Sequence, residues 1–298
     1  MSHSEFDTHW LNHRFSFDEA ARNRQVERAA LQHLAAHSSL HLLDIGSGTG
    51  ANFLHFFEQL DRPQHWYLLD HDPRLLAASL HRIATYAQEK NYPHQRRGDQ
   101  LLLHLGPHEV RVQTLSGSFE QLETLVDLSR LDLVLASAFF DLFRADQLLT
   151  LLDKLGRAKL AFLFTLSYRS MIFDPSTPTD ERMVQYYEAH MQRPQATGAA
   201  MGPHCSRHLR DWLLEGTFDF VEGESAWQIG PTDFTMLHYL LGFMRTAIAE
   251  LEVGDDGAVP SEQWWRERTE AVHSARLGLV VRHWDYFAAP RPETGVSS

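Results

Sequence analysis

The sequence has one cysteine, no long apolar run and no excess of positive charge. Cys205 stands alone among the 298 residues, so an internal disulfide is excluded. No window reaches the roughly 18 apolar residues of a membrane-spanning helix, and the polar start MSHSEFDTHW lacks the apolar stretch of a signal peptide. We therefore predict a cytoplasmic protein without membrane association.

The charge balance argues against nucleic acid as a partner. The chain has 39 acidic and 27 basic residues, a formal net charge of −12, whereas phosphate binding needs a basic surface. The short stretch HQRRGDQ at 94–100 is the nearest candidate for a local basic patch. The 19 histidines are scattered and form neither an H-E-x-x-H motif nor a Cys/His cluster, so we predict no metal site.

Apolar strand-like segments alternate with amphipathic helical ones through the first half of the chain. A helix is predicted over 17–37, with Asp18 placed to cap its beginning. Buried strands follow, separated by helices, at 40–45, 65–70, 110–116, 131–137 and 159–168. Such alternation is typical of a doubly wound α/β fold with a parallel sheet covered on both faces.

The regular alternation stops after residue 168. Residues 169–205 contain four prolines, several aromatic residues and one predicted helix near 179–192, and we interpret this segment as a lid. Regular elements resume over 206–288, ending in a helix at 232–250 and a strand at 276–288. We expect a single domain over 1–298, with its ligand-binding core at 40–168.

Three of the chain's 17 glycines fall within five positions, in the stretch LLDIGSGTGANFL at 42–54. Gly46 permits a tight strand-to-helix turn, and Gly48 and Gly50 let the backbone approach a ligand. Twenty residues later Asp70 ends the second strand, where a carboxylate can accept the ribose hydroxyls of an adenosine. A strand-to-helix turn that binds no ligand needs only one glycine, and it does not predict an acidic residue at position 70.

The spacing and the neighbouring aspartate distinguish between adenosine ligands. Nicotinamide enzymes use G-x-G-x-x-G, whereas this chain has G-x-G-x-G preceded by Asp44. An aspartate there repels a pyrophosphate and favours a ligand that carries an ammonium group, as S-adenosylmethionine does. A nicotinamide-dependent dehydrogenase remains the second enzyme hypothesis.

The motifs resemble those of the class I S-adenosylmethionine-dependent methyltransferases. LLDIGSGTG at 42–50, YLLDHDPRLL at 67–76 and LDLVLASAFFDLF at 131–143 match the first, second and fourth motifs of that family. The segment SAWQIGPTDFTMLHYLLGF is similar to uncharacterised bacterial methyltransferases of this class. The resemblance implies a doubly wound, mostly parallel seven-stranded sheet with a C-terminal antiparallel hairpin, formed by FDFVEG and RLGLVVRHW. It implies S-adenosylmethionine as cofactor and S-adenosylhomocysteine as product.

The resemblance also assigns cofactor-binding residues. Asp44 and the backbone of residues 46–50 are expected to hold the methionine moiety, and Asp70 the ribose. His71 or Asp72 is expected beside the adenine. Where the family often has an acid after strand three, this chain has Ser118 followed by Phe119, which favours ring stacking. The candidates are Arg22 (a partner for the ligand carboxylate, or a solvated helix residue), Asp44, Gly46, Ser47, Gly48, Gly50, Asn52, Asp70, His71, Asp72, Ser118, Phe119 and Ser137.

Methyl transfer from a sulfonium needs in-line placement of the acceptor and, for a hydroxyl or ammonium acceptor, a general base. Asp141, at the end of the fourth motif, is our first candidate, although it is equally placed to cap the next helix. Tyr168 and His190 of the lid are the other catalytic candidates. Further candidates for residues near the acceptor are His204, Trp227, His283 and Trp284.

The fourth motif lacks the N-P-P-[YF] or D-P-P-Y tetrapeptide associated with methylation of planar amides and exocyclic amines. Together with the acidic charge, this favours a small-molecule acceptor methylated at O, N or C by a monomer or homodimer. A sensor or partner protein that binds the cofactor without catalysis remains an alternative of a different class. Group transfer of the spermidine-synthase type is a weaker alternative, because the sequence shows no paired carboxylates of the kind expected near a polyamine.

Overall fold

A nine-stranded mixed sheet forms the centre of the molecule. The computed structural model of the chain describes residues 8–195, 198–251 and 262–292. Across the sheet the strands follow in the order β10 (Phe218–Ile229), β11 (Gly278–Pro290), β7 (Phe162–Asp174), β6 (Leu133–Ser137), β1 (Leu40–Ile45), β2 (Gln64–Asp70), β5 (His108–Ser116), β4 (Gln100–Leu105) and β3 (His94–Arg97).

The five central strands β7, β6, β1, β2 and β5 are parallel, and the two strands at each edge pair antiparallel with their neighbours. The predicted α/β class and the antiparallel pairing of β10 with β11 are confirmed. The predicted seven strands are wrong, because β3 and β4 add a hairpin at one edge. The strand order reverses beside β1, and open α/β sheets bind ligands at such a point.

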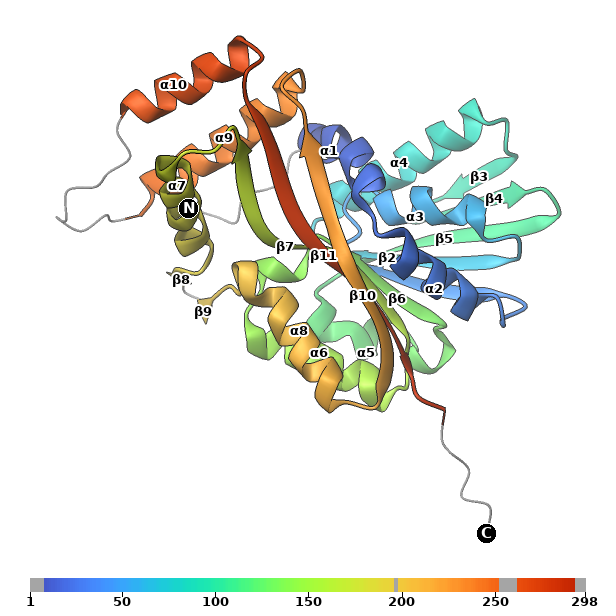
Figure 1. Cartoon of the computed structure of the whole chain (residues 1–298). Coiled ribbons are helices and arrows are strands. Elements are labelled where there is room, and N and C mark those ends of the chain that lie inside the picture. The colour runs from blue at the N-terminus through green and yellow to red at the C-terminus, as the bar shows by residue number, and fades with distance from the viewer. Residues whose placement is uncertain (1–7, 196–197, 252–261, 293–298) are drawn as a thin grey trace.

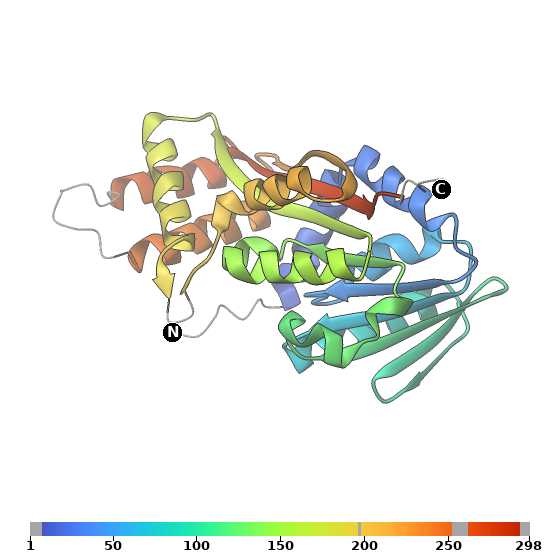
Figure 2. The same cartoon turned by 90° about the horizontal axis from the view of Figure 1, so that it is seen from below.

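Helices cover both faces of the central strands, which Figures 1 and 2 show from two directions. One face packs against α2 (Arg24–Leu34), α3 (Ala51–Phe56), the short 3-10 helix η1 (Phe57–Gln59) and α4 (Pro73–Glu89). The other packs against α5 (Leu122–Leu125), α6 (Ala145–Arg157) and α8 (Cys205–Glu215). Consecutive residues of a strand point to opposite faces, so Leu42 belongs to the first core and Leu43 to the second.

A third core lies beyond the carboxyl ends of the central strands. Ser137, the last residue of β6, pairs with Thr165, so residues 166–174 of β7 extend past the end of β6. This extension and β10 and β11 pack against α1 (Thr8–Ala21), α7 (Pro178–Met191), α9 (Phe234–Ala249) and α10 (Glu262–His273). Figure 1 shows α7, α9 and α10 at the opposite end of the molecule from the β3–β4 hairpin.

The N-terminal helix predicted over 17–37 is two helices. α1 ends at Ala21 and α2 begins at Arg24. Asn23 caps α2, because its side-chain oxygen accepts from two backbone amides of the first turn, and such local bonding competes with helix continuation. Asp18 caps nothing; it lies inside α1 and accepts a hydrogen bond from the Trp227 indole at 3.0 Å.

The segment predicted as a lid is partly strand. Residues 169–174 complete β7, and the bounds of α7 agree within one residue with the helix predicted over 179–192. Next come two short strands of two residues each, β8 (Pro194–Gln195) and β9 (Gly198–Ala199), which pair with one another, and then the 3-10 helix η5 (Gly202–His204). Residues 196–197 lie outside the described residues.

Other elements differ from the expected pattern in extent. The candidate basic patch at 94–100 forms β3 and the tight turn into β4. α10 was not predicted, and β10 runs to Ile229, well past the predicted hairpin segment FDFVEG at 218–223. Within the described ranges, no helix combines the length and apolarity needed to cross a bilayer.

Candidate active site

The glycine-rich loop connects β1 to α3. Gly46, Gly48 and Gly50 have φ values of +64°, +51° and +78°, the left-handed region that favours glycine. The Ser47 amide donates to the Leu69 carbonyl at 3.0 Å, which holds the loop against the end of β2. The loop therefore lies where the strand order reverses.

Asp70 ends β2 and binds this loop directly. Its Oδ2 accepts from the Gly48 amide at 2.9 Å, and its Oδ1 accepts from the Asp72 amide at 3.0 Å. His71 Nδ1 lies 3.3 Å from the same Oδ1, with its ring largely exposed. A carboxylate has about four acceptor positions, so capacity for further donors remains.

Asp44, at the carboxyl end of β1, is buried with one oxygen unpaired. Its Oδ1 accepts from Asn52 Nδ2 at 2.7 Å, while Oδ2 has no hydrogen-bond partner among the described residues. Burial raises the pKa of Asp44 to about 7, against the Asn52 hydrogen bond and the nearby Arg22, which lower it. Ser47 Oγ is also buried and unpaired within the described part of the chain.

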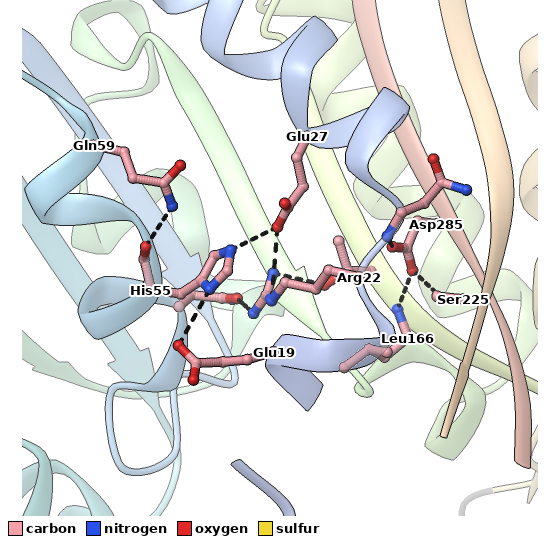
Figure 3. A network of polar contacts seen from close by, with 11 residues as sticks. Glu19, Arg22, Glu27, His55, Gln59, Leu166, Ser225 and Asp285 are labelled. Carbon is pink, nitrogen blue, oxygen red and sulfur yellow. Dashed lines mark hydrogen bonds and ion pairs between the residues drawn. The ribbon is translucent and has the colours of Figure 1, made fainter. Parts of the chain in front are cut away.

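Arg22 is buried in the break between α1 and α2, so its interpretation as a solvated helix residue is wrong. Its Nη2 donates to Asn52 Oδ1 at 2.6 Å and its Nη1 to Thr165 Oγ1 at 3.4 Å. Figure 3 shows the guanidinium beside Glu27, which lies 3.9 Å from Nε and also contacts His55 at 2.6 Å. The guanidinium thus joins Asn52 of the glycine-loop region to α2 and β7.

Two predicted adenine neighbours act as helix caps. Asp72 begins α4 by accepting from the Arg74 amide at 2.8 Å, and the Arg74 side chain lowers the pKa of Asp72 to about 2. Ser118 begins the 3-10 helix η2 (Phe119–Gln121) and accepts from the Glu120 amide at 3.2 Å. The side chains of Asp72 and Ser118 therefore stabilise the starts of their helices.

Phe119 belongs to an aromatic cluster that reaches the glycine loop. Its ring is buried and meets Phe139 and Phe143 edge-to-face, with centroids 5.8 and 4.9 Å apart. A Cβ added to Gly46 would lie 2.2 Å from the Phe139 ring. The missing side chain of Gly46 therefore makes room for Phe139 in this structure.

Two non-glycine residues near the site have left-handed backbone. Ala138 follows Ser137 at the end of β6 with a φ of +48°, and Leu166 of β7 has a φ of +56°. Such backbone costs free energy and persists where its surroundings fix it. Asp285 does so at Leu166, whose amide donates to its Oδ1 at 2.7 Å, and Ser225 donates to the same oxygen at 2.5 Å (Figure 3).

Asp141 lies in the 3-10 helix η4 (Phe140–Leu142), and its alternative role as cap of the next helix is wrong, because α6 has Arg144 at its N-cap. The side chain is buried, and Oδ1 has no hydrogen-bond partner in the described structure. Burial raises the pKa of Asp141 to about 6, opposed by the positive charge of Arg14.

Tyr168 lies near Asp141, whereas His190 does not contact either residue. The Tyr168 hydroxyl donates to Glu188 Oε1 at 3.1 Å, and the charge of Asp141 contributes to raising the pKa of Tyr168. His190 Nε2 lies 3.2 Å from Glu250 Oε2, where the end of α7 meets the end of α9. The structure thus brings together two of the three catalytic candidates.

Arg14, which was not among the predicted site residues, links several aromatic and acidic side chains. Its guanidinium binds Asp18 through Nε at 2.9 Å and Nη2 at 3.2 Å, and lies 5.0 Å from the Trp227 ring and 6.0 Å from the Trp10 ring. The spacing of Trp10, Arg14 and Asp18 at every fourth position was the available signal, because it places them on one helical face. In the described ranges, no group of three or more His, Cys, Asp or Glu residues is arranged to hold a metal ion.

Comparison with known proteins finds similarity only among solved structures. No family model matches the sequence, and no curated protein sequence is similar to it. Phosphoethanolamine N-methyltransferase 2 of Haemonchus contortus, solved with S-adenosylhomocysteine, is 13% identical with a TM-score of 0.45. The match covers 97% of this chain and 58% of that chain, so this chain spans little more than half of its length.

Two further structures show similar values. A cyclopropane synthase of Mycobacterium tuberculosis is 13% identical with a TM-score of 0.43, over 93% of this chain and 94% of that one. An arsenic(III) S-adenosylmethionine methyltransferase of Chlamydomonas reinhardtii is 12% identical with a TM-score of 0.44, over 94% and 74%. At these values the similarity assigns no activity to this chain.

Proposed function

We propose that the chain binds S-adenosylmethionine at the glycine-rich loop and transfers its methyl group to a small-molecule acceptor. The observation that carries the proposal is the loop itself. Three left-handed glycines lie at the carboxyl end of β1, and the Asp70 carboxylate at the end of β2 holds the amide of Gly48. This arrangement combines a glycine-rich turn at the carboxyl end of a central strand with an acid in the position that suits a ribose.

The unpaired buried atoms fit such a ligand. Asp44 Oδ2 is an acceptor without a partner among the described residues, and the ammonium of the methionine moiety supplies a donor. Ser47 Oγ, also unpaired there, is available to the same moiety. In this proposal Asp70 accepts from the ribose hydroxyls, and Ser118, Phe119, His71 and Asp72 line the adenine side.

The bound cofactor supplies an electrophilic methyl group. This chain's own residues then orient the acceptor and accept its proton, and Asp141 is the proposed general base, with Tyr168 beside it. The proposal also includes a single domain over residues 1–298, with the cofactor-binding core at 40–168. Cytoplasmic location, a monomeric or homodimeric state, and the absence of membrane and nucleic-acid partners stay predictions.

Calorimetry with S-adenosylhomocysteine tests the binding half of the proposal. Wild-type protein is expected to bind the compound, and Asp70→Ala to lose about 1–3 kcal/mol of binding free energy, because hydrogen bonds to a charged group are lost. Asp127→Ala is the control, since that acid is exposed and caps the short 3-10 helix at Leu128–Arg130. Absence of binding to the wild type, or equal affinities of wild type and Asp70→Ala, would contradict the assignment.

Transfer is tested separately from binding. Protein incubated with methyl-labelled cofactor and a metabolite extract is expected to label a small molecule. A sensor protein would bind the cofactor and label nothing, and a dehydrogenase would respond to reduced nicotinamide nucleotide. Binding without labelling would therefore replace the enzyme proposal by the sensor hypothesis.

A further inference from the structure

Three buried polar atoms without hydrogen-bond partners in the described structure occur around Arg14. They are Trp10 Nε1, Asp141 Oδ1 and His283 Nδ1. The exposed fractions of these residues are 4%, 8% and 3%. We call Trp10, Arg14, Asp141, Tyr168, Trp227 and His283 the Arg14 cluster.

Ring contacts and charges connect the members of the Arg14 cluster. The His283 ring lies 4.8 Å from Trp227 and 6.4 Å from Tyr168, measured between centroids, and Trp227 lies 6.1 Å from Trp10. Ring contacts therefore join residues of α1, β7, β10 and β11 in one place. Burial raises the pKa of Asp141 and lowers that of His283, and the charge of Arg14 acts on both groups, which connects Asp141 of η4 electrostatically to the cluster.

Unpaired buried polar groups are rare in native proteins, and each costs free energy. The Arg14 cluster contains a donor in the indole of Trp10, an acceptor in Asp141, and a ring nitrogen of His283 whose role depends on its tautomer. A ligand that supplies the missing partners recovers that cost. The concentration of such atoms beside the proposed general base points to a binding site for the acceptor.

The charge of the cluster selects the class of ligand. The positive charge of Arg14 is paired with Asp18 through two hydrogen bonds, and burial lowers the pKa of His283 to about 3, so that ring is uncharged at neutral pH. The carboxylates of Asp141 and Glu188 are left without a compensating Lys or Arg ion pair in the described structure. The surrounding rings of Trp10, Trp227 and Tyr168 present faces that attract cations.

We infer that the Arg14 cluster is the acceptor site of the proposed methyltransferase and that its acceptor is an amine, bound as the ammonium ion by Asp141 among aromatic rings. This inference rests on the proposed function and narrows it to transfer onto nitrogen. An acceptor bound through a carboxylate or phosphate is disfavoured, because it would face Asp141 and Glu188.

The transfer step balances with these groups. An N–H bond of the ammonium breaks and its proton passes to the Asp141 carboxylate. The freed nitrogen lone pair forms the new N–C bond to the methyl carbon, and the pair of the breaking C–S bond stays on sulfur, giving S-adenosylhomocysteine. No oxidant or further reactant is needed.

Matched probes of three charges test the inference in protein saturated with S-adenosylhomocysteine. Benzylamine, benzyl alcohol and benzoate have similar shapes, as do tryptamine, tryptophol and indole-3-acetate. Calorimetry is expected to show at least one amine binding tenfold or more tighter than its neutral and anionic counterparts. Tighter binding of the alcohols or acids, or no binding of either amine, overturns the inference.

A pair of variants connects the binding to Asp141. Asp141→Asn keeps the shape and is expected to weaken amine binding at least tenfold while leaving S-adenosylhomocysteine affinity unchanged. Asp146→Asn, on the exposed surface of α6, is the control expected to change neither. If Asp141→Asn binds the amine as the wild type does, the inference fails while the proposed cofactor site stands. Failure of the wild type to bind S-adenosylhomocysteine refutes the proposed function instead.

The pH dependence gives a readout independent of turnover. Arg14 of α1, Tyr168 of β7, Tyr187 of α7 and Cys205 of α8 interact electrostatically with Asp141, and the tyrosines and the thiol have raised pKa values that keep them neutral at pH 5–8. Amine affinity is expected to fall as pH drops below about 6, where Asp141 becomes protonated. Asp141→Asn is expected to remove this fall, and persistence of the full fall in that variant contradicts the inference.

Discussion

Among single residues, Asp44 illustrates a conflict between binding and stability. Its pKa is raised to about 7 by burial, well above the value of a carboxyl in an unfolded chain. The folded state therefore holds a proton that the unfolded state has lost between pH 4 and pH 7. By linkage, Asp44 lowers the free energy of unfolding as pH rises through this window.

Replacing Asp44 by asparagine is expected to stabilise the unliganded protein at pH 8 and to weaken cofactor binding. The gain in the free energy of unfolding is up to about 4 kcal/mol, because each unit of pKa shift corresponds to about 1.4 kcal/mol. The introduced amide retains an acceptor for Asn52 but offers no charge to an ammonium. Urea unfolding at pH 5 and pH 8, with calorimetry of S-adenosylhomocysteine, measures both effects. A destabilised variant at pH 8 would show that the charge is compensated.

Gly46 gives a second prediction at this scale. Gly46→Ala places an alanine at a φ of +64° and brings its Cβ against the Phe139 ring. The free energy of unfolding, measured with urea, is expected to fall by about 1–2 kcal/mol from backbone strain and by a further amount of about 1–3 kcal/mol from overpacking. Gly98→Ala is the matched control, because its φ is +62° but nothing lies within 4 Å of the added Cβ. Equal losses in the two variants would exclude the clash with Phe139.

The candidate site was predictable where its residues are close in sequence. Gly46, Gly48 and Asp70 were found because strand, loop and helix spacing place them together over 25 positions. Arg14 and His283 were not brought together by any pattern, since α1 and β11 meet only through tertiary packing. Arg22 was expected within a helix, as a partner for the ligand carboxylate or as a solvated residue, and the break at Asn23 buries it.

At the scale of elements, the same local rules explain which helices and strands were predicted. The parallel strands were recognisable as short apolar runs because both of their faces are buried. β3 was missed because all four of its residues are exposed, and no alternation marks it. α1 was missed over residues 8–16 because its buried residues contact α9, β10 and the glycine loop on different sides rather than one continuous face.

Asn23 is expected to determine where α1 ends and α2 begins. Asn23→Ala removes the oxygen that accepts from the amides of Gln25 and Val26, and is expected to reduce the free energy of unfolding by about 0.5–2 kcal/mol. Asn23→Ser is expected to recover most of that loss, because serine also caps. Thermal and urea unfolding measure the difference, and an alanine variant as stable as the serine variant would argue against the cap.

At the scale of the whole molecule, α1 contacts both proposed sites. Leu11 lies against Gly48, with 3.5 Å between its Cδ1 and a Cβ built on the glycine. Phe15 stacks at 4.4 Å on the guanidinium of Arg82, which donates to Thr49 of the loop at 3.0 Å. On another side of the same helix, Trp10 and Arg14 belong to the Arg14 cluster.

Because one helix touches both sites, their ligands are expected to be coupled. S-adenosylhomocysteine is expected to change benzylamine affinity by about fivefold or more, and benzylamine to change S-adenosylhomocysteine affinity by the same factor, as linkage requires. Calorimetry of each ligand with and without the other measures the coupling. Leu11→Ala is expected to reduce it, and independent binding of the two ligands in the wild type would contradict it.

The position of α1 also has a kinetic consequence. In the proposed enzyme, a helix that rests on the glycine loop and on the Arg14 cluster is expected to lift before spent cofactor and methylated product leave. Departure of both products is then governed by a single opening rate, and faster chemistry would not raise turnover beyond it.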